Sequence, residues 1–197
     1  MSRRAATTEG YGMFAVVEYA HDTGILNYID RDRIGATGHS AGGNAAIRGA
    51  NYFGREAIAS GQPSKLHSVF VSGYVLTLRD DVLGDVRSNV GMSYAFYDEG
   101  AYRNELANGD MRIAPESLRL VNSGLAPAEH ITEVEIGRWY GSLGNRTARI
   151  VHNEMLLHPF QPYNREATAN QIAYFEHVFG WQSPIPLDDQ VLSLIHI

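Results

Sequence analysis

The sequence contains no cysteine, which excludes disulfide bridges, thiolate nucleophiles and cysteine-based zinc sites. It also lacks a run of about 18 apolar residues, the length that a membrane-spanning helix needs, and no apolar segment follows the basic start MSRRAATTEG. A basic stripe is missing too, and the formal net charge is -6 at pH 7. We therefore expect no nucleic-acid partner, and any covalent nucleophile must be a residue other than cysteine.

The composition is that of a globular domain, because 44% of the 197 residues are hydrophobic and 19% are charged. We expect residues 1–182 to form one domain and residues 183–197 to form a tail. The tail ends in SLIHI, which resembles the translated sequencing-adapter scar of some metagenomic reading frames. We therefore exclude the last few residues from the predicted fold, with a natural apolar C-terminus as the alternative.

Apolar runs alternate with helical patterns along the chain, and this alternation predicts an α/β fold with a mostly parallel sheet flanked by helices. Thr7 or Thr8 can cap the first predicted helix, and Asn164 can cap the last. Helices are predicted over about 9–23, 41–56 and 164–181. Strands are predicted over about 33–38 and within 67–78, 88–97 and 147–159.

Ser40 lies in the segment GHSAGG, between a predicted strand and a predicted helix. A G-x-S-x-G pattern alone is a weak signal, but a nucleophile elbow requires this strand–turn–helix context. The sharp turn brings the residues two before and two after the serine together, so we expect Gly38 and Gly42 to be needed because they lack a Cβ atom. Ser40 is expected to adopt a strained backbone conformation that projects its Oγ atom out of the turn.

The helix predicted after the elbow begins at Ala41, and its N-terminus directs backbone N–H groups and a positive dipole end toward the serine. An oxyanion that formed there would be stabilised. The alternative is a glycine-rich turn in which Ser40 only caps the helix, and the chain would then be a non-catalytic α/β module.

A serine nucleophile needs a base, and His158 is the preferred candidate among eight histidines. It follows an apolar strand run in LLHPFQPYN, so we expect it on a loop at the carboxyl edge of the sheet, where open α/β folds build their sites. His152 lies inside the same predicted strand and is expected to be packed. The other histidines before the tail come too early, lie in the elbow or the last helix, or have no strand before them: His21, His39, His67, His130 and His177.

Asp98 is the preferred acid because it is the first carboxylate after the predicted strand that contains NVGMSYAFY. If Asp98 accepts the Nδ1 proton of His158, the Nε2 atom of His158 is left to face Ser40. Glu99 is the nearest competitor. An earlier acidic group is expected to form a charged loop: Asp80, Asp81 and Asp85.

A weaker alternative is a metal site, since His152, Glu154 and His158 are close in sequence. On a strand, His152 and Glu154 share a face, but the sequence offers no clear third ligand. We therefore expect neither a metal nor a cofactor.

In three segments the chain resembles the α/β-hydrolase superfamily, specifically bacterial serine hydrolases with a GHSAGG or GHSMGG elbow. The segments are IDRDRIGATGHSAGG, AFYDEG, and NRTARIVHNEMLLHP before a helix. The resemblance implies a triad of Ser40, Asp98 and His158, with the Ala41 N–H as one oxyanion-hole donor. It covers the whole elbow: Gly38, His39, Ser40, Ala41, Gly42 and Gly43. The implied activity is cleavage of a small-molecule carboxylic ester through an acyl-enzyme, with a peptidase or acyltransferase as the alternative.

The chain departs from this family at its start. In the family the elbow follows the fifth strand of an eight-stranded sheet, yet only one helix is predicted before it here. The resemblance thus implies the C-terminal part of a hydrolase domain, with equivalents of strands 5 to 8. The loop that supplies a second oxyanion-hole donor would be missing, and the unpaired edge of the elbow strand would favour aggregation or pairing with a partner. Some bacterial relatives carry a membrane segment after this region, so membrane association, localisation and oligomeric state stay open.

Overall fold

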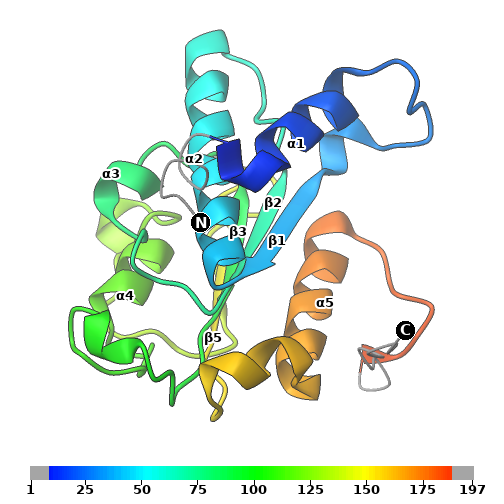
Figure 1. Cartoon of the computed structure of the whole chain (residues 1–197). Helices are drawn as coiled ribbons and strands as arrows, with labels where there is room; N and C mark the ends of the chain where they lie inside the picture. The colour runs from blue at the N-terminus through cyan, green and yellow to red at the C-terminus, as the bar shows by residue number, and fades with distance from the viewer. Residues whose placement is uncertain (1–8, 188–197) are drawn as a thin grey trace.

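The computed structural model of the chain describes residues 9–187 (Figure 1). Within these residues, five strands form one sheet in the order β1-β2-β3-β5-β4. Four of them run parallel, namely β1 (Gly35–His39), β2 (Ser68–Ser72), β3 (Asn89–Ser93) and β5 (Arg149–His152). The fifth, β4 (Trp139–Tyr140), pairs antiparallel with β5. The predicted α/β fold with a mostly parallel sheet is confirmed, although β4 was not predicted.

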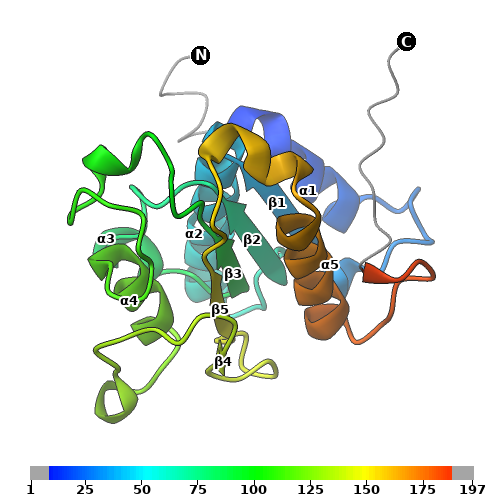
Figure 2. The ribbon, with the colours of Figure 1, turned by 90° about the horizontal axis from the view of Figure 1, so that it is seen from below.

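Helices cover both faces of the sheet (Figure 2). On one face, the core joins the strands to α2 (Ala41–Ser60), α3 (Asp80–Leu83) and α4 (Pro115–Asn122), with α1 (Met13–Asp22) packed on α2. On the other face lies α5 (Arg165–Phe179). Neighbouring residues of a strand point to opposite faces, so Val69 and Val71 join the first core while Phe70 packs against Tyr174 of α5. Every residue of β2 and β3 is buried, as expected for central parallel strands.

The first helix begins later than the predicted residue 9. Gly10 (φ 52°), Tyr11 (φ 55°) and Gly12 (φ 90°) have left-handed backbone conformations that an α-helix cannot contain, so the chain forms a short 3-10 turn before Met13. The proposed caps Thr7 and Thr8 lie outside the described residues. At the other end of the chain, the predicted cap of α5 is confirmed, because Asn164 Oδ1 accepts a hydrogen bond from the Ala167 N–H at 3.0 Å.

The predicted strands are longer than the observed ones. The run within 67–78 stops at Ser72 because Gly73 has a φ of 61° and turns the chain, while Val75 and Leu78 remain buried in the loop that follows. The next two strands also stop short of their predicted ends, at Ser93 and His152. These three strand ends and the end of β1 lie at one edge of the sheet, where polar side chains gather.

β1 forms one end of the sheet, so within residues 9–187 it has a strand neighbour on one side only, as the sequence predicted. Helix α2 runs past its predicted end to Ser60, where Gly61 in a left-handed conformation (φ 70°) terminates it. No helix in this part of the chain combines the length and the apolar character needed to cross a membrane.

Candidate functional site

Ser40 is the residue at which β1 turns into α2, and its backbone is strained. It has φ 56° and ψ -114°, a combination that a residue with a side chain rarely adopts. Its N–H donates a hydrogen bond to the carbonyl of Ser72 at 2.8 Å, which ties the turn to the end of β2. Ser40 occupies the N-cap position of α2, but its side chain makes no capping hydrogen bond, so the part of the alternative in which the Ser40 side chain caps the helix is wrong.

The three glycines of the elbow differ in the space that a side chain would have. A Cβ atom on Gly38 would lie 2.3 Å from the carbonyl carbon of Gly42, so the predicted crowding at Gly38 is confirmed. At Gly42 a Cβ atom would meet nothing within 4 Å, so the predicted steric need for glycine there is wrong. The reason is that the backbone of Gly42, not its Cβ position, faces Gly38. Gly43 does need to be small, since its Cβ atom would lie 2.8 Å from the carbonyl oxygen of Ser72.

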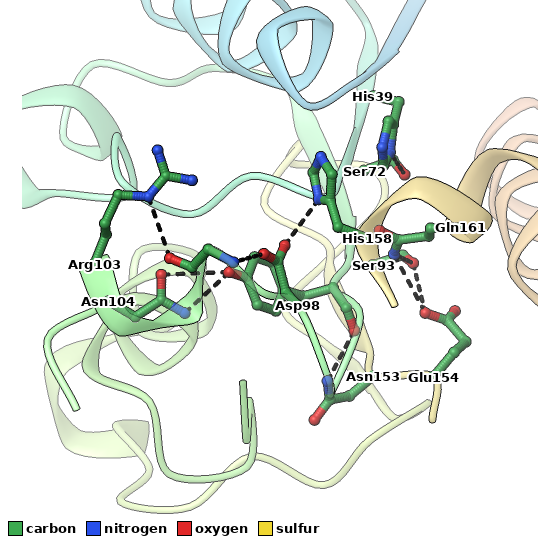
Figure 3. A network of polar contacts seen from close by, with 12 residues as sticks. His39, Ser72, Ser93, Asp98, Arg103, Asn104, Asn153, Glu154, His158 and Gln161 are labelled. Carbon is green, nitrogen blue, oxygen red and sulfur yellow. Dashed lines mark hydrogen bonds and ion pairs between the residues drawn. The ribbon is translucent and has the colours of Figure 1, made fainter. Parts of the chain in front are cut away.

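Asp98 and His158 are hydrogen-bonded although 60 residues separate them in the sequence. Asp98 Oδ2 lies 2.8 Å from His158 Nδ1, and an ionised carboxylate only accepts, so Nδ1 is the donor (Figure 3). The second carboxylate oxygen, Oδ1, accepts from the Gly100 N–H at 2.6 Å. The Asp98 side chain is only 5% exposed, whereas Glu99 is exposed and makes no ion pair or side-chain hydrogen bond within residues 9–187. The geometry therefore favours Asp98 over Glu99 as the partner of His158.

One cavity of about 250 Å³ joins this pair to the elbow. Ser40, Ala41, Asp98 and His158 all line it. Ala41 is the first residue of α2, so its N–H has no acceptor within the helix and can donate into the cavity. No hydrogen bond between Ser40 and His158 occurs in the described part of the chain.

Several polar residues that line the cavity were not found from the sequence. Tyr94 directly follows β3 and Tyr74 lies two residues after the end of β2, and their position after buried strands is a usable signal. Nothing in the local pattern marked the others. The cavity residues missed are Tyr11, Asn44, Tyr74, Tyr94, Arg103 and Asn104.

His39, the residue before Ser40, packs against His158. The two ring centroids lie 4.5 Å apart, and His39 Nδ1 is 3.0 Å from Ser72 Oγ. Burial, reinforced by the neighbouring His158, lowers the pKa of His39 from 6.5 to about 4. His39 is thus neutral near pH 7, and its uncharged ring packs against the His158 ring at an angle of 38°.

A buried polar network anchors the segment that carries His158. His158 is the first residue of a 3-10 helix, η6 (His158–Tyr163), and Gln161 in this helix is only 1% exposed. Gln161 Nε2 donates to Ser93 Oγ at the end of β3 and to Glu154 Oε2 (Figure 3). Glu154 is also buried, and it accepts from Ser93 Oγ at 2.7 Å and from Asn170 Nδ2 at 3.1 Å. These bonds join η6 to β3 and α5.

The alternative of a metal site formed by His152, Glu154 and His158 is not supported by the positions of these side chains. Within residues 9–187 no group of three His, Asp or Glu side chains is placed to hold a metal ion. The carboxylate of Glu154 already accepts hydrogen bonds from Ser93 and its neighbours. His152 is packed at the end of β5 near Phe70, as expected. Burial lowers the pKa of His152 to about 4.

The remaining candidates lie apart from the cavity. Asp80 and Asp81 begin the short helix α3 rather than a loop, and Asp81 pairs with Arg79 at 2.9 Å. His130 is exposed after a 3-10 turn. The other histidines contact Asp22, Phe179 and Trp139, respectively: His21, His67 and His177.

No family model matches the chain, and no curated protein is similar to it in sequence. The inference of function therefore depends on the site geometry. That geometry brings a hydroxyl, an imidazole and a carboxylate to one cavity, in the chain order Ser, Asp, His. An imidazole held by a carboxylate can accept a proton from a nearby hydroxyl, which turns the hydroxyl into a nucleophile.

Proposed function

We propose that the chain carries the catalytic triad of an α/β-hydrolase-type serine hydrolase, which cleaves carboxylic esters through an acyl-enzyme on Ser40. The observation that carries the proposal is the Asp98–His158 hydrogen bond of 2.8 Å in the cavity that Ser40 also lines. The backbone of Ser40 supports it, because its φ of 56° combined with a ψ of -114° is a strained conformation, and such residues cluster at active sites.

In the proposed acylation step, Asp98 holds the proton on Nδ1 of His158, so Nε2 is free to act as the base. Ser40 Oγ attacks the ester carbonyl carbon while its proton moves to Nε2, and the carbonyl electrons move onto oxygen. The Ala41 N–H donates to this oxyanion. The intermediate then collapses, the alkoxide leaves, and it takes the proton from Nε2 to become an alcohol.

Deacylation repeats these steps with water as the nucleophile. His158 removes a proton from water, the hydroxide attacks the acyl carbon, and collapse returns the electron pair and the proton to Ser40. The product is a carboxylic acid. The cavity of about 250 Å³ is smaller than the pockets that hold drug-sized ligands, so short acyl or alcohol groups fit it best.

The Ala41 N–H is the one oxyanion donor assigned here, and removal of one such donor costs about 2.7 to 4 kcal/mol in serine hydrolases. Turnover by this chain is therefore expected to be slow. A reagent that reports nucleophilicity in a single step is a better first test than turnover.

That test is labelling with a fluorophosphonate, in which Ser40 Oγ bonds to phosphorus, fluoride leaves, and His158 takes the hydroxyl proton. Peptide mass spectrometry should place the adduct on Ser40 alone. Ser40→Ala should abolish labelling, and Ser60→Ala, at the exposed end of α2, should not change it. If folded wild-type protein stays unlabelled, the proposal is wrong, and a non-catalytic module whose elbow is only a turn is favoured instead.

A further inference from the structure

Arg103 lines the same cavity as Ser40, and it is the only arginine or lysine to do so among the described residues. It is the last residue of a short 3-10 helix, η4 (Ala101–Arg103), that follows Asp98. In Figure 3, Arg103 and His158 lie on opposite sides of Asp98. The cavity thus has a cation on one side of the carboxylate and the imidazole on the other.

The guanidinium of Arg103 is oriented but has free donors. Its Nε donates to the carbonyl of Gly100 at 3.2 Å, and its Cζ lies 5.7 Å from the centre of the Tyr102 ring. Within residues 9–187, no hydrogen bond or ion pair occupies Nη1 or Nη2. The side chain is exposed, so these two groups are accessible to a ligand.

The carboxylate in the cavity does not neutralise Arg103. Both oxygens of Asp98 are already engaged, one by His158 and the other by the Gly100 N–H, and no ion pair with Arg103 forms. The positive charge of Arg103 is opposite in sign to the formal net charge of the protein, which is -6 and repels anions. An unpaired cation in the cavity that Ser40 lines is therefore a local feature that favours a negative ligand.

We propose that Arg103 binds a carboxylate of the substrate, so that the Ser40 cavity prefers esters whose acyl group carries a negative charge. This inference rests on the proposed esterase function. The planar guanidinium presents parallel N–H groups that match the two oxygens of a carboxylate, and such charge-assisted pairs are stronger than neutral hydrogen bonds. Arg103 is then a specificity-determining residue, and it takes no part in proton transfer.

The test compares two 4-nitrophenyl esters of the same length. One is the mono-ester of glutarate, and the other is the ester of 5-oxohexanoate, in which a methyl ketone replaces the carboxylate. Arg103→Gln is expected to lower kcat/KM for the glutarate ester by about tenfold or more, with the neutral ester changed less than about twofold. Arg103→Lys keeps the positive charge but lacks the paired N–H donors of the guanidinium, so its kcat/KM for the glutarate ester should lie between those of wild type and Arg103→Gln.

Arg55→Gln is the matched control, because Arg55 is exposed on α2 and lies about 16 Å along this helix from Asn44, the last residue of α2 that lines the cavity. It removes the same charge and should not alter the ratio of the two rates. A second readout needs no turnover: glutarate dianion should slow fluorophosphonate labelling of Ser40 in wild type, but not in Arg103→Gln.

The outcomes separate the two proposals. If Arg103→Gln slows both esters equally, Arg103 acts on the fold or on Asp98, and the inference is wrong. If it slows neither ester, the inference is wrong as well, while esterase activity on both keeps the proposed function intact. If wild type cleaves neither ester and Ser40 is not labelled, the proposed function itself has failed, and the inference fails with it.

Discussion

Gly38 and Gly42 face each other across the elbow, but only Gly38 has no space for a side chain. A Cβ atom on Gly38 would lie 2.3 Å from the carbonyl carbon and 2.4 Å from the carbonyl oxygen of Gly42, whereas a Cβ atom on Gly42 would meet nothing within 4 Å. Both contacts at Gly38 are with backbone, which cannot rotate away as a side chain can. The two glycines of the motif are therefore not equivalent.

We predict that Gly38→Ala lowers the free energy of unfolding by about 1 to 3 kcal/mol, as overpacking does, and that it abolishes fluorophosphonate labelling of Ser40. Gly42→Ala is the matched control. It places alanine in the first turn of α2, where alanine is the better helix former, so stability should be unchanged or slightly higher. Urea unfolding of both variants measures this, and equal losses would contradict the geometry described here.

The choice between Asp98 and Glu99 can be tested by neutralising each carboxylate. Asp98→Asn leaves an amide that cannot accept from both His158 Nδ1 and the Gly100 N–H, so the ring loses its orientation. We expect the rate of Ser40 acylation to fall by about a thousandfold or more. Glu99→Gln, one residue along the chain and exposed, should change it little. Stopped-flow measurement of acylation gives both rates, and a larger effect at Glu99 would assign the acid there.

Gln161 is predicted to position His158 through η6. Gln161→Met keeps the size of the side chain but removes the bonds to Ser93 and Glu154, and it leaves buried oxygens with fewer donors. We expect a loss of about 1 to 3 kcal/mol in stability and slower labelling of Ser40 in the protein that stays folded. Gln62→Met, in the exposed loop after α2, is the control and should alter neither. Labelling at the wild-type rate in Gln161→Met would show that η6 holds His158 without this network.

The partly buried histidines His152 and His39 predict a stability that falls in mild acid. The pKa of His152 is lowered from 6.5 to about 4, chiefly by burial and against the opposing effect of Glu166. At a pH between these two pKa values, His152 binds a proton in the unfolded chain but not in the folded chain, so stability rises with pH. The contribution is complete above about pH 6.5 and is lost as the pH falls toward 4. His39 acts in the same direction.

Replacing His152 should therefore flatten this pH dependence. In His152→Gln, we expect the difference in unfolding free energy between about pH 7.5 and about pH 5 to shrink by about 1 to 2 kcal/mol. His130→Gln removes an exposed histidine and serves as the control. Urea unfolding at the two pH values measures the difference, and an unchanged slope in His152→Gln would mean that His152 titrates normally in the folded protein.

The elbow could be predicted because it is local. A strand, a sharp turn and a helix within a few residues impose their own steric demands, and small residues around Ser40 meet them. The same local logic predicted that Asp98 and His158 lie close together, since each follows a buried run and parallel strands end at a common edge. The local pattern does not show on which side of the turn space remains, so the predicted need for glycine at position 42 is wrong.

The sequence by itself determined the α/β alternation, the strained position of Ser40 and the order Ser, Asp, His, because backbone sterics and hydrophobic periodicity act over short stretches of chain. Tertiary structure alone decided that Asp98 and His158 form a hydrogen bond, that Gln161 joins η6 to β3, and that Arg103 lies in the Ser40 cavity. These contacts join segments far apart in sequence. They depend on how the loops fold over the sheet edge, a packing that no local pattern encodes.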